Sequence, residues 1–280
     1  MNYHLHENGW TVILDNVDLK TITQEDVNQI AKLIATNTCV VVRDQYLSVE
    51  EEMRVINMFK DPEPYVEPTD DDYKQCWVDG TDGIIQRVTG ALNDHGYEGL
   101  AGFVDEMVWH CNQPHKQDRR SIVWLYGVNG TAGSRTSWNN NILTYNDLDH
   151  DTRQYISNLK FIPVTGLELD VNVIETTGVV AEDFVPSVVH TNNAGKTGLF
   201  FPFFQIYKFV GMSIEETQKI IEPIKEFTIQ DKYCYHHDWK DGDLVLSEQW
   251  LGLHKRWPFA HIKTRLLHRA VFDFPEQDYS

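Results

Sequence analysis

Two segments near the N-terminus have the hydrophobic spacing of amphipathic helices. After Thr23, apolar residues recur every three or four positions, which predicts a helix that packs one face on a core. These apolar positions are Val27, Ile30, Ala31 and Ile34. Thr23 with Asp26, and Ser48 with Glu51, have the spacing of capping boxes, and the second box predicts a helix that ends near residue 59. We expect both helices to flank the fold and to take no part in chemistry.

The rest of the chain carries mainly strand-length apolar runs bounded by turn residues. The predicted strands are residues 9–14, 38–43, 84–89, 121–127, 161–171, 233–239 and 244–246. Two more helices are predicted, one over 146–159 and one that starts at Ser213. The second carries the apolar residues Ile220, Ile221, Ile224 and Phe227. Strands that dominate the middle and end, with helices early or in insertions, predict a mainly β fold with flanking helices, a double-stranded β-helix (jelly roll, cupin-like).

Length and composition fit one domain over residues 1–280. The chain has 41% hydrophobic and 12% aromatic residues, enough for a sizeable core. Its formal net charge of −18 argues against nucleic acid or an anionic membrane surface as a partner. We expect neither a signal peptide nor a membrane span, and the four cysteines have no metal-site or redox spacing. These features predict a protein of the reducing cytoplasm, and they leave homo-oligomer formation open.

The candidate chemistry centres on residues 108–114, Val-Trp-His-Cys-Asn-Gln-Pro. If this segment is an extended strand, His110 and Asn112 point to one face and Cys111 to the other. A His-x-Asp pair with this spacing is typical of mononuclear non-haem iron sites with two histidines and one carboxylate, but here the second position is an amide. Taken alone, such a pair is more often two ordinary hydrogen-bonded residues than a metal site.

The C-terminal segment supplies a second histidine and two arginines. A turn at residues 240–243 leads into an apolar strand, and His254 follows. Arg265 lies eleven residues after His254, and Arg269 lies four residues further. With this spacing the chain resembles the taurine dioxygenase (TauD/TfdA) family of iron(II)- and 2-oxoglutarate-dependent oxygenases, whose distal histidine is followed at this distance by Arg-x-x-x-Arg. Other segments resemble the family in the same order, so that the similarity covers nearly the whole chain: residues 40–45, 188–200 and 209–213.

The resemblance implies an oxygenase and a set of site residues. His110 and His254 would bind iron(II), which 2-oxoglutarate would chelate. Arg265, assisted by Thr136, would bind the far carboxylate of this cosubstrate, because a planar guanidinium can hold a carboxylate by two hydrogen bonds. Dioxygen would convert 2-oxoglutarate to succinate and carbon dioxide, and a small-molecule substrate would be hydroxylated.

The resemblance also bears on the substrate. In the taurine-using members the arginine that matches Arg269 binds the acidic group of the substrate, which would predict an anionic molecule. The alternatives are a place near the cosubstrate carboxylate and a buried salt bridge. His190, Phe203 and Phe204 lie in segments expected to line the pocket, although aromatic residues there are more often part of a core. The acidic segment 61–82 is predicted to be a surface loop that is long enough for an active-site lid.

Asn112 departs from the family pattern. Iron(II) with one aspartate and dianionic 2-oxoglutarate carries one net negative charge, whereas neutral Asn112 leaves the site uncharged and is the weaker donor. Three alternatives follow. Asn112 binds iron through its oxygen and supports hydroxylation; it swings aside for chloride and permits halogenation; or the metal is lost and the fold is kept as a binding scaffold.

Two arguments rank these alternatives. The resembled halogenases have Gly or Ala at this position, which opens space for a halide, and Asn112 fills that space. Hydroxylation is therefore favoured over halogenation. His254, Arg265 and Thr136 argue against a scaffold, because a dead site has no need of a group that binds the cosubstrate.

Overall fold

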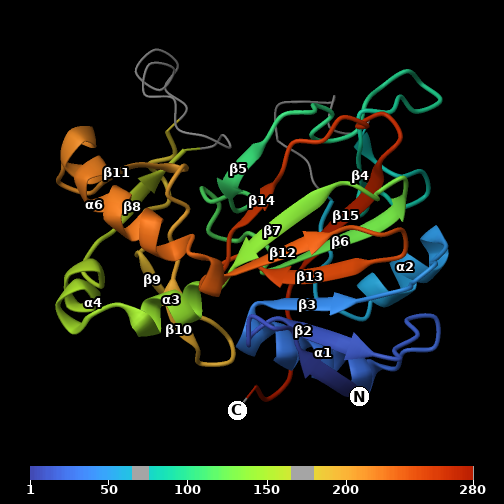
Figure 1. Ribbon diagram of the computed structural model, residues 1–280, viewed down its shortest axis with the longest axis horizontal. Coiled ribbons are helices and arrows are strands. Elements are labelled where there is room, and N and C mark those ends of the chain that lie inside the picture. The colour runs from blue at the N-terminus through green and yellow to red at the C-terminus, as the bar shows by residue number, and fades with distance from the viewer. Residues whose placement is uncertain (65–75, 165–179, 280) are drawn as a thin grey trace.

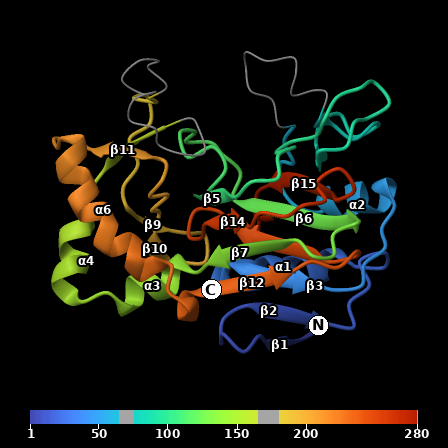
Figure 2. The same ribbon diagram turned by 45° about the horizontal axis from the view of Figure 1, so that its top comes forward.

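The computed structural model describes residues 1–64, 76–164 and 180–279, and two facing β-sheets form its centre (Figures 1 and 2). The larger sheet has seven strands, in the order β1 (Asn2–Leu5), β2 (Val12–Asp15), β3 (Cys39–Val42), β13 (Leu244–Glu248), β6 (Ile122–Asn129), β15 (Leu266–Phe272) and β4 (Gln86–Val88). The smaller sheet has four, in the order β12 (Cys234–Asp238), β7 (Arg135–Asn139), β14 (His254–Arg256) and β5 (Met107–His110). This is the double-sheeted, mainly β architecture that the sequence predicts.

Both faces of the larger sheet are buried, as alternate residues of β6 show. Val123 and Leu125 belong to the hydrophobic cluster between the two sheets. Trp124 belongs to the cluster on the opposite face, under α1 (Gln24–Asn37) and α2 (Val49–Ile56). Because successive side chains of a strand point to opposite faces, a strand covered on both sides has a continuous apolar sequence.

The two N-terminal helices begin where the capping boxes predict. The side chain of Thr23 accepts a hydrogen bond from the N–H of Asp26, that of Ser48 accepts one from Glu51, and the reciprocal bond is present in each case. The predicted apolar stripe of α1 is fully buried. The second helix is shorter than predicted, because after Ile56 the backbone tightens into turns with hydrogen bonds to the third residue back.

The single helix predicted over 146–159 is wrong. The chain forms two short helices there, α3 (Asn141–Asp147) and α4 (His150–Ile156). Leu148 between them is extended, and Asp149 caps α4 by accepting a hydrogen bond from the N–H of Thr152. An aspartate in this position satisfies a free N–H at the start of a new helix, so it divides the segment that hydrophobic spacing alone would join.

The strand predictions hold for the apolar strands and fail for strands that begin with polar or exposed residues. The strand expected at 9–14 is β2, which begins at Val12, and the exposed edge strand β1 that precedes it was not predicted. Strand β7 was also missed, because its first residues are polar. Of the strand predicted at 161–171, the part within the described residues contains β8 (Phe161–Pro163). Residues 65–75 of the segment predicted as a surface loop, 61–82, lie outside the described residues, so its possible role as a lid stays a prediction.

A helical lobe lies beside the two sheets and covers one end of β5 (Figure 1). It consists of α3, α4, α6 (Ile214–Thr228) and two strand pairs, β8 with β11 (Ile206–Phe209) and β9 (Val189–Thr191) with β10 (Thr197–Leu199). Its hydrophobic core includes Trp109 and Cys111. The predicted capping box at Ser213 is present in α6, and Ile221 and Ile224 are buried. The segment that carries His110 therefore lies where the lobe meets the sheets.

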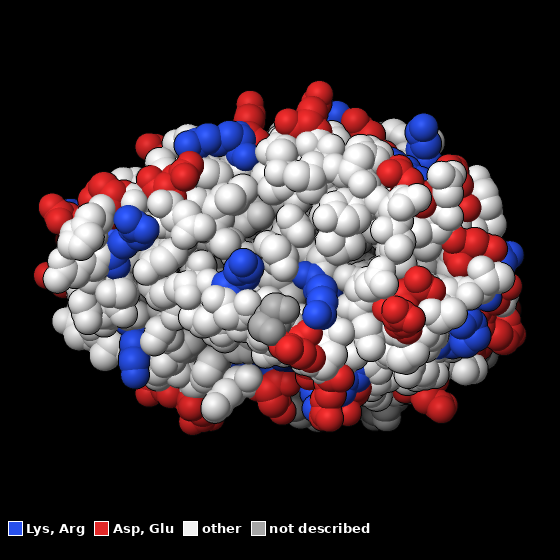
Figure 3. Space-filling model, turned by 90° about the horizontal axis from the view of Figure 1, so that it is seen from below, with Lys and Arg blue, Asp and Glu red and all other residues white. Residues whose placement is uncertain are grey.

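The surface agrees with an acidic protein. On the face drawn in Figure 3, acidic and basic side chains are interspersed around the rim, and the basic ones do not gather into a patch. Within residues 1–64, 76–164 and 180–279, no helix combines the length and the apolar character needed to cross a membrane.

Candidate active site

His110 and His254 lie directly opposite each other on neighbouring antiparallel strands, β5 and β14. Their ring centroids are 4.1 Å apart. His110 is 2% exposed, and its Nδ1 is 2.7 Å from the carbonyl oxygen of Val108. A carbonyl can only accept, so Nδ1–H is the donor and the lone pair of Nε2 is available to a metal.

Both imidazoles are held neutral. Burial, together with the positive charges of Arg269 and Arg256, lowers the pKa of His110 to about 4. Burial is also the largest cause that lowers the pKa of His254, followed by His110 and Arg269. A divalent metal binds only the neutral form of histidine, so the pair is ready to bind one over a wide pH range.

Asn112 does not share a strand with His110. Strand β5 ends at His110, and Asn112 lies in the bend that follows, so the predicted alternation along one strand does not apply to it. Its N–H donates to Oε1 of Gln249 at 3.1 Å. Its side-chain Nδ2 is buried without a hydrogen-bond partner among the described residues. Cys111 points the other way, as predicted, into the core of the helical lobe.

The donor set fits a divalent metal that has no carboxylate ligand. In the described part of the chain, no three His, Cys, Asp or Glu residues come together as a metal site. Two neutral imidazoles and one amide would therefore have to hold the ion. The unpartnered atom of Asn112 is Nδ2, which can only donate a hydrogen bond, so a metal in this set would have to be bound by the amide oxygen.

Arg265 is a buried cation that forms no ion pair with a described residue. It is 2% exposed, and its Nε donates to Oγ of Ser134 at 3.0 Å. Its Nη1 has no hydrogen-bond partner among the described residues. Burial, and after it the charge of Arg256, lowers the pKa of Arg265 to about 9, so it is still charged at neutral pH. Such a group fits the far carboxylate of a dianionic cosubstrate.

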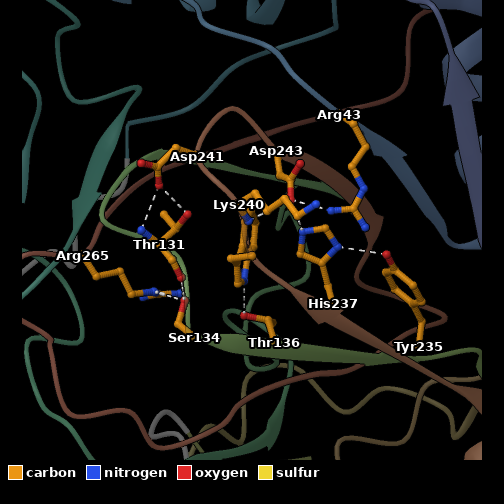
Figure 4. Close-up of polar contacts among 11 residues, drawn as sticks. Arg43, Thr131, Ser134, Thr136, Tyr235, His237, Lys240, Asp241, Asp243 and Arg265 are labelled. Atoms are coloured by element: carbon orange, nitrogen blue, oxygen red, sulfur yellow. Dashed lines mark hydrogen bonds and ion pairs between the residues drawn. The ribbon is translucent and has the colours of Figure 1, made fainter.

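Figure 4 shows how the loop between β6 and β7 reaches Arg265. Thr131 donates to the carboxylate of Asp241 through both its N–H, at 2.9 Å, and its hydroxyl, at 2.7 Å. Gly130 has a positive φ, and a Cβ there would collide with the backbone of Thr264. Only glycine lets the loop pack this closely against the residue before Arg265. The sequence prediction missed Ser134, because its role depends on this contact.

Thr136 lies on β7, in a strand and not in a turn. Its side chain is buried, and its hydroxyl oxygen accepts a hydrogen bond from the indole Nε1–H of Trp239 at 2.9 Å. Trp239 was not predicted to take part in the site. An indole can only donate, so the hydroxyl hydrogen of Thr136 is left for another acceptor.

A buried polar chain runs from Arg43 through Asp243 and His237 to Tyr235 (Figure 4). Nε2 of His237 is 3.1 Å from Oδ2 of Asp243, and that oxygen is 2.6 Å from Nη1 of Arg43. The other ring nitrogen of His237 is 2.9 Å from the hydroxyl of Tyr235. The ring of His237 meets that of Trp239 nearly at right angles, with centroids 4.6 Å apart. These contacts hold Trp239 in place beside the smaller sheet.

Two more buried arginines lie near the histidine pair. Arg269 on β15 donates from Nη1 to Oε1 of Gln86 at 2.7 Å. Its charge lowers the pKa of both histidines. Arg256, which the sequence prediction did not select, donates to the carbonyl oxygens of Ala101, Phe103 and Asp105 at 2.7–2.8 Å. It holds the loop that leads into β5.

His190 and Phe204 belong to the helical lobe. The ring of His190 stacks on that of Trp250, with centroids 4.6 Å apart, and lines a cavity whose walls do not include the histidine pair. Phe204 packs edge to face on Phe203 at 4.9 Å. A role of either residue in substrate binding stays a prediction.

Known proteins resemble this chain both in sequence and in fold. The family model of the taurine catabolism dioxygenase TauD, TfdA family matches residues 4–271. Among solved structures, a taurine dioxygenase from Burkholderia xenovorans superposes with a TM-score of 0.73 at 19% identity, covering 94% of this chain and 85% of that one. AAD-2 in complex with Mn(II) and N-oxalylglycine has a TM-score of 0.77 at 16% identity, covering 98% and 99%. Curated proteins give no match.

The structural matches confirm the predicted jelly roll, and the family match extends over nearly the whole chain. This protein belongs to the TauD/TfdA family of 2-oxoglutarate-dependent dioxygenases.

Proposed function

We propose that this protein is an Fe(II)- and 2-oxoglutarate-dependent oxygenase that hydroxylates a small anionic molecule and releases succinate and carbon dioxide. The observation that carries the proposal is the combination of two neutral, opposed imidazoles with a buried guanidinium that has no counter-ion among the described residues. An imidazole pair suits iron, and the guanidinium suits a carboxylate in a water-poor pocket.

We assign the iron to His110, His254 and the amide oxygen of Asn112, and the far carboxylate of 2-oxoglutarate to Arg265 and Thr136. When bound, iron(II) and 2-oxoglutarate supply the oxidising chemistry, in which dioxygen is consumed and one oxygen atom enters the substrate. The protein supplies binding and orientation. The Val108 carbonyl fixes the tautomer of His110, and the Ser134 hydroxyl fixes the plane of Arg265.

Arg269 supports an anionic substrate. Its buried guanidinium lies close enough to the histidine pair to lower the pKa of both rings. The amide oxygen of Gln86 accepts a hydrogen bond from its Nη1 and helps to orient the guanidinium. A planar guanidinium suits the carboxylate or sulfonate of an anionic substrate.

Halogenation is the second candidate, and one observation favours it. The Nδ2 of Asn112 is a buried donor without a partner among the described residues, and an N–H donor can bind a halide. The comparisons give chloride no support. We therefore keep hydroxylation as the first candidate and let product analysis in the presence of chloride decide.

The first experiment is an anaerobic titration of the purified protein with iron(II) and 2-oxoglutarate, with and without chloride. We expect the weak visible metal-to-ligand charge-transfer band of a chelated iron centre. A shift of the band that depends on chloride would favour halogenation. If the band is absent at saturating iron, the protein is a binding scaffold and the proposal is wrong.

Turnover gives the second test. Succinate formation from 2-oxoglutarate should be lost in His110→Ala, His254→Ala and Arg265→Ala. The matched control is His150→Ala, because His150 is an exposed histidine on α4. If all three site variants kept wild-type turnover, the assigned residues would not be the active site.

A further inference from the structure

A cavity lies behind residues 108–114, which carry the candidate metal ligands His110 and Asn112, on the side to which Cys111 points. It encloses about 430 Å³ between the hairpin β9–β10, the end of β13 and residues 117–121. The walls that matter here are formed by Arg119, His190, Asn192, Glu248 and Trp250. Neither the histidine pair nor the arginines of the candidate active site line it.

Arg119 brings a buried positive charge to this cavity. It is 3% exposed, and its guanidinium carbon lies 3.7 Å from the ring centre of Trp250 and 4.0 Å from that of Phe200. Its terminal nitrogens make only long contacts, 3.7 Å to Sγ of Cys111 and 3.4 Å to the carbonyl oxygen of Gln249. Among the described residues, its Nε has no hydrogen-bond partner and no carboxylate forms an ion pair with it. A buried charge in this state is costly unless an ion of opposite sign binds.

Glu248 forms no ion pair with Arg119, although the charge of each residue favours the charged form of the other. It is 2% exposed, and its Oε2 accepts a hydrogen bond from Nδ2 of Asn192 at 3.0 Å. The other oxygen, Oε1, has no hydrogen-bond partner in the described chain. Burial raises the pKa of Glu248 to about 8, against the opposing effects of Asn192 and Arg119. At neutral pH the carboxyl is therefore mostly protonated, and its O–H is a second donor beside Arg119.

We propose that this cavity binds a small monocarboxylate, whose oxygens accept hydrogen bonds from Nε of Arg119 and from the carboxyl of Glu248. The single buried positive charge of Arg119 matches the single negative charge of a monocarboxylate. The rim carries Asp61, Asp118 and Asp273 against Lys60 and Arg120, which disfavours a second negative charge such as that of phosphate. His190 is neutral here, because burial and the charge of Arg119 lower its pKa to about 4.

The site adjoins the candidate metal centre without sharing its residues. Arg119 contacts Cys111, the residue between His110 and Asn112. It also contacts the backbone of Gln249, whose side chain accepts the N–H of Asn112. A carboxylate bound to Arg119 would therefore be separated from the candidate metal ligands by Arg119 and Cys111. The inference needs neither iron nor 2-oxoglutarate and stands apart from the proposed activity.

The probe is acetate, titrated calorimetrically at pH 7 into the metal-free full-length protein in a buffer without carboxylates. The measurement is made in an Arg265→Gln background, because acetate could also bind to that buried guanidinium. We expect one acetate per chain, and at least a tenfold loss of affinity on adding Arg119→Gln. Glu248→Gln should keep the affinity, because its amide still donates. Phosphate should bind at least tenfold more weakly than acetate.

Arg120→Gln is the matched control. Arg120 is the next residue, but it is paired with Glu63 and Asp273, so its loss should leave acetate binding unchanged. Crystals soaked in acetate provide a test that does not depend on the folding of any variant. Planar density at Nε of Arg119 would support the site. Only water there, or acetate binding that survives in a folded Arg119→Gln variant, would overturn it.

Discussion

The indole of Trp239 donates a hydrogen bond to the hydroxyl oxygen of Thr136 at 2.9 Å, across the neighbouring strands of the smaller sheet. Trp239 directly follows β12, and Thr136 lies on β7. The contact uses one lone pair of the threonine oxygen and leaves its hydrogen for another acceptor. Trp239 therefore orients the hydroxyl that we assign to 2-oxoglutarate.

Trp239→Phe should raise the KM for 2-oxoglutarate about fivefold with little change in kcat, because one hydrogen bond is worth about 1 kcal/mol. Thr136→Val should have a similar effect. The double variant should be no worse than the more damaging single variant, because both changes remove the same interaction. Steady-state kinetics with varied 2-oxoglutarate checks this, and additive effects would contradict a shared role.

Arg265→Lys should weaken the binding of 2-oxoglutarate by one to two orders of magnitude, about 1.5–3 kcal/mol. Lysine keeps the charge but loses the fork that Ser134 holds in plane. Anaerobic titration of the iron-loaded protein measures the dissociation constant. Arg135→Lys is the control, since Arg135 is exposed, one residue before Thr136, and paired with Asp238. If the two variants had equal effects, Arg265 would not be the residue that binds 2-oxoglutarate.

Asn112→Asp should raise the affinity for iron(II) at least about tenfold, because a carboxylate adds a negative charge beside the metal. Asn112→Leu, which has similar size but no donor atom, should lower it. Anaerobic calorimetry with iron(II) measures both variants. If neither variant changes the affinity, Asn112 does not touch the metal and the two histidines bind it without this residue.

Glu248→Gln should make the protein more stable, and more so at higher pH. Burial raises the pKa of Glu248 from 4.5 to about 8, so the folded state holds a proton that the unfolded state releases above its own pKa. The free energy of unfolding of the wild type therefore falls between about pH 4.5 and 8, by at most about 1.4 kcal/mol per unit of pKa difference, and is level above that range.

Urea denaturation at pH 5.5 and 8.5 measures this effect. The gain of Glu248→Gln over wild type should be small at the lower pH and largest at the higher one. Glu182→Gln is the control at an exposed position and should show no such dependence. A gain of equal size at both pH values would mean that packing, and not ionisation, causes it.

Local sequence determined the elements whose causes lie within a few residues. The capping boxes at Thr23 and Ser48 fixed the starts of two helices, and strand-length apolar runs marked β3, β6 and β13. Asp149, by contrast, was predicted to lie inside a helix, whereas it caps the start of α4. Hydrophobic spacing gives no information about a capping hydrogen bond. Strand β7 was missed because its first residues are polar and its pairing partners, β12 and β14, lie about a hundred residues further along the chain.

The sequence by itself also identified the candidate site residues. These are His110, Asn112, His254, Arg265 and Arg269, which have the spacing of the family, with an amide at position 112 where the family has an acid. Only the tertiary structure decided how these groups meet. It opposed the two histidines across a strand pair, moved Asn112 into a bend, and brought Ser134 and Trp239 to residues distant in the chain. It also left Arg119 buried without a counter-ion among the described residues, which no local pattern predicts. The reason is physical: propensity and spacing act over a few residues, whereas burial and pairing depend on which distant strands lie side by side.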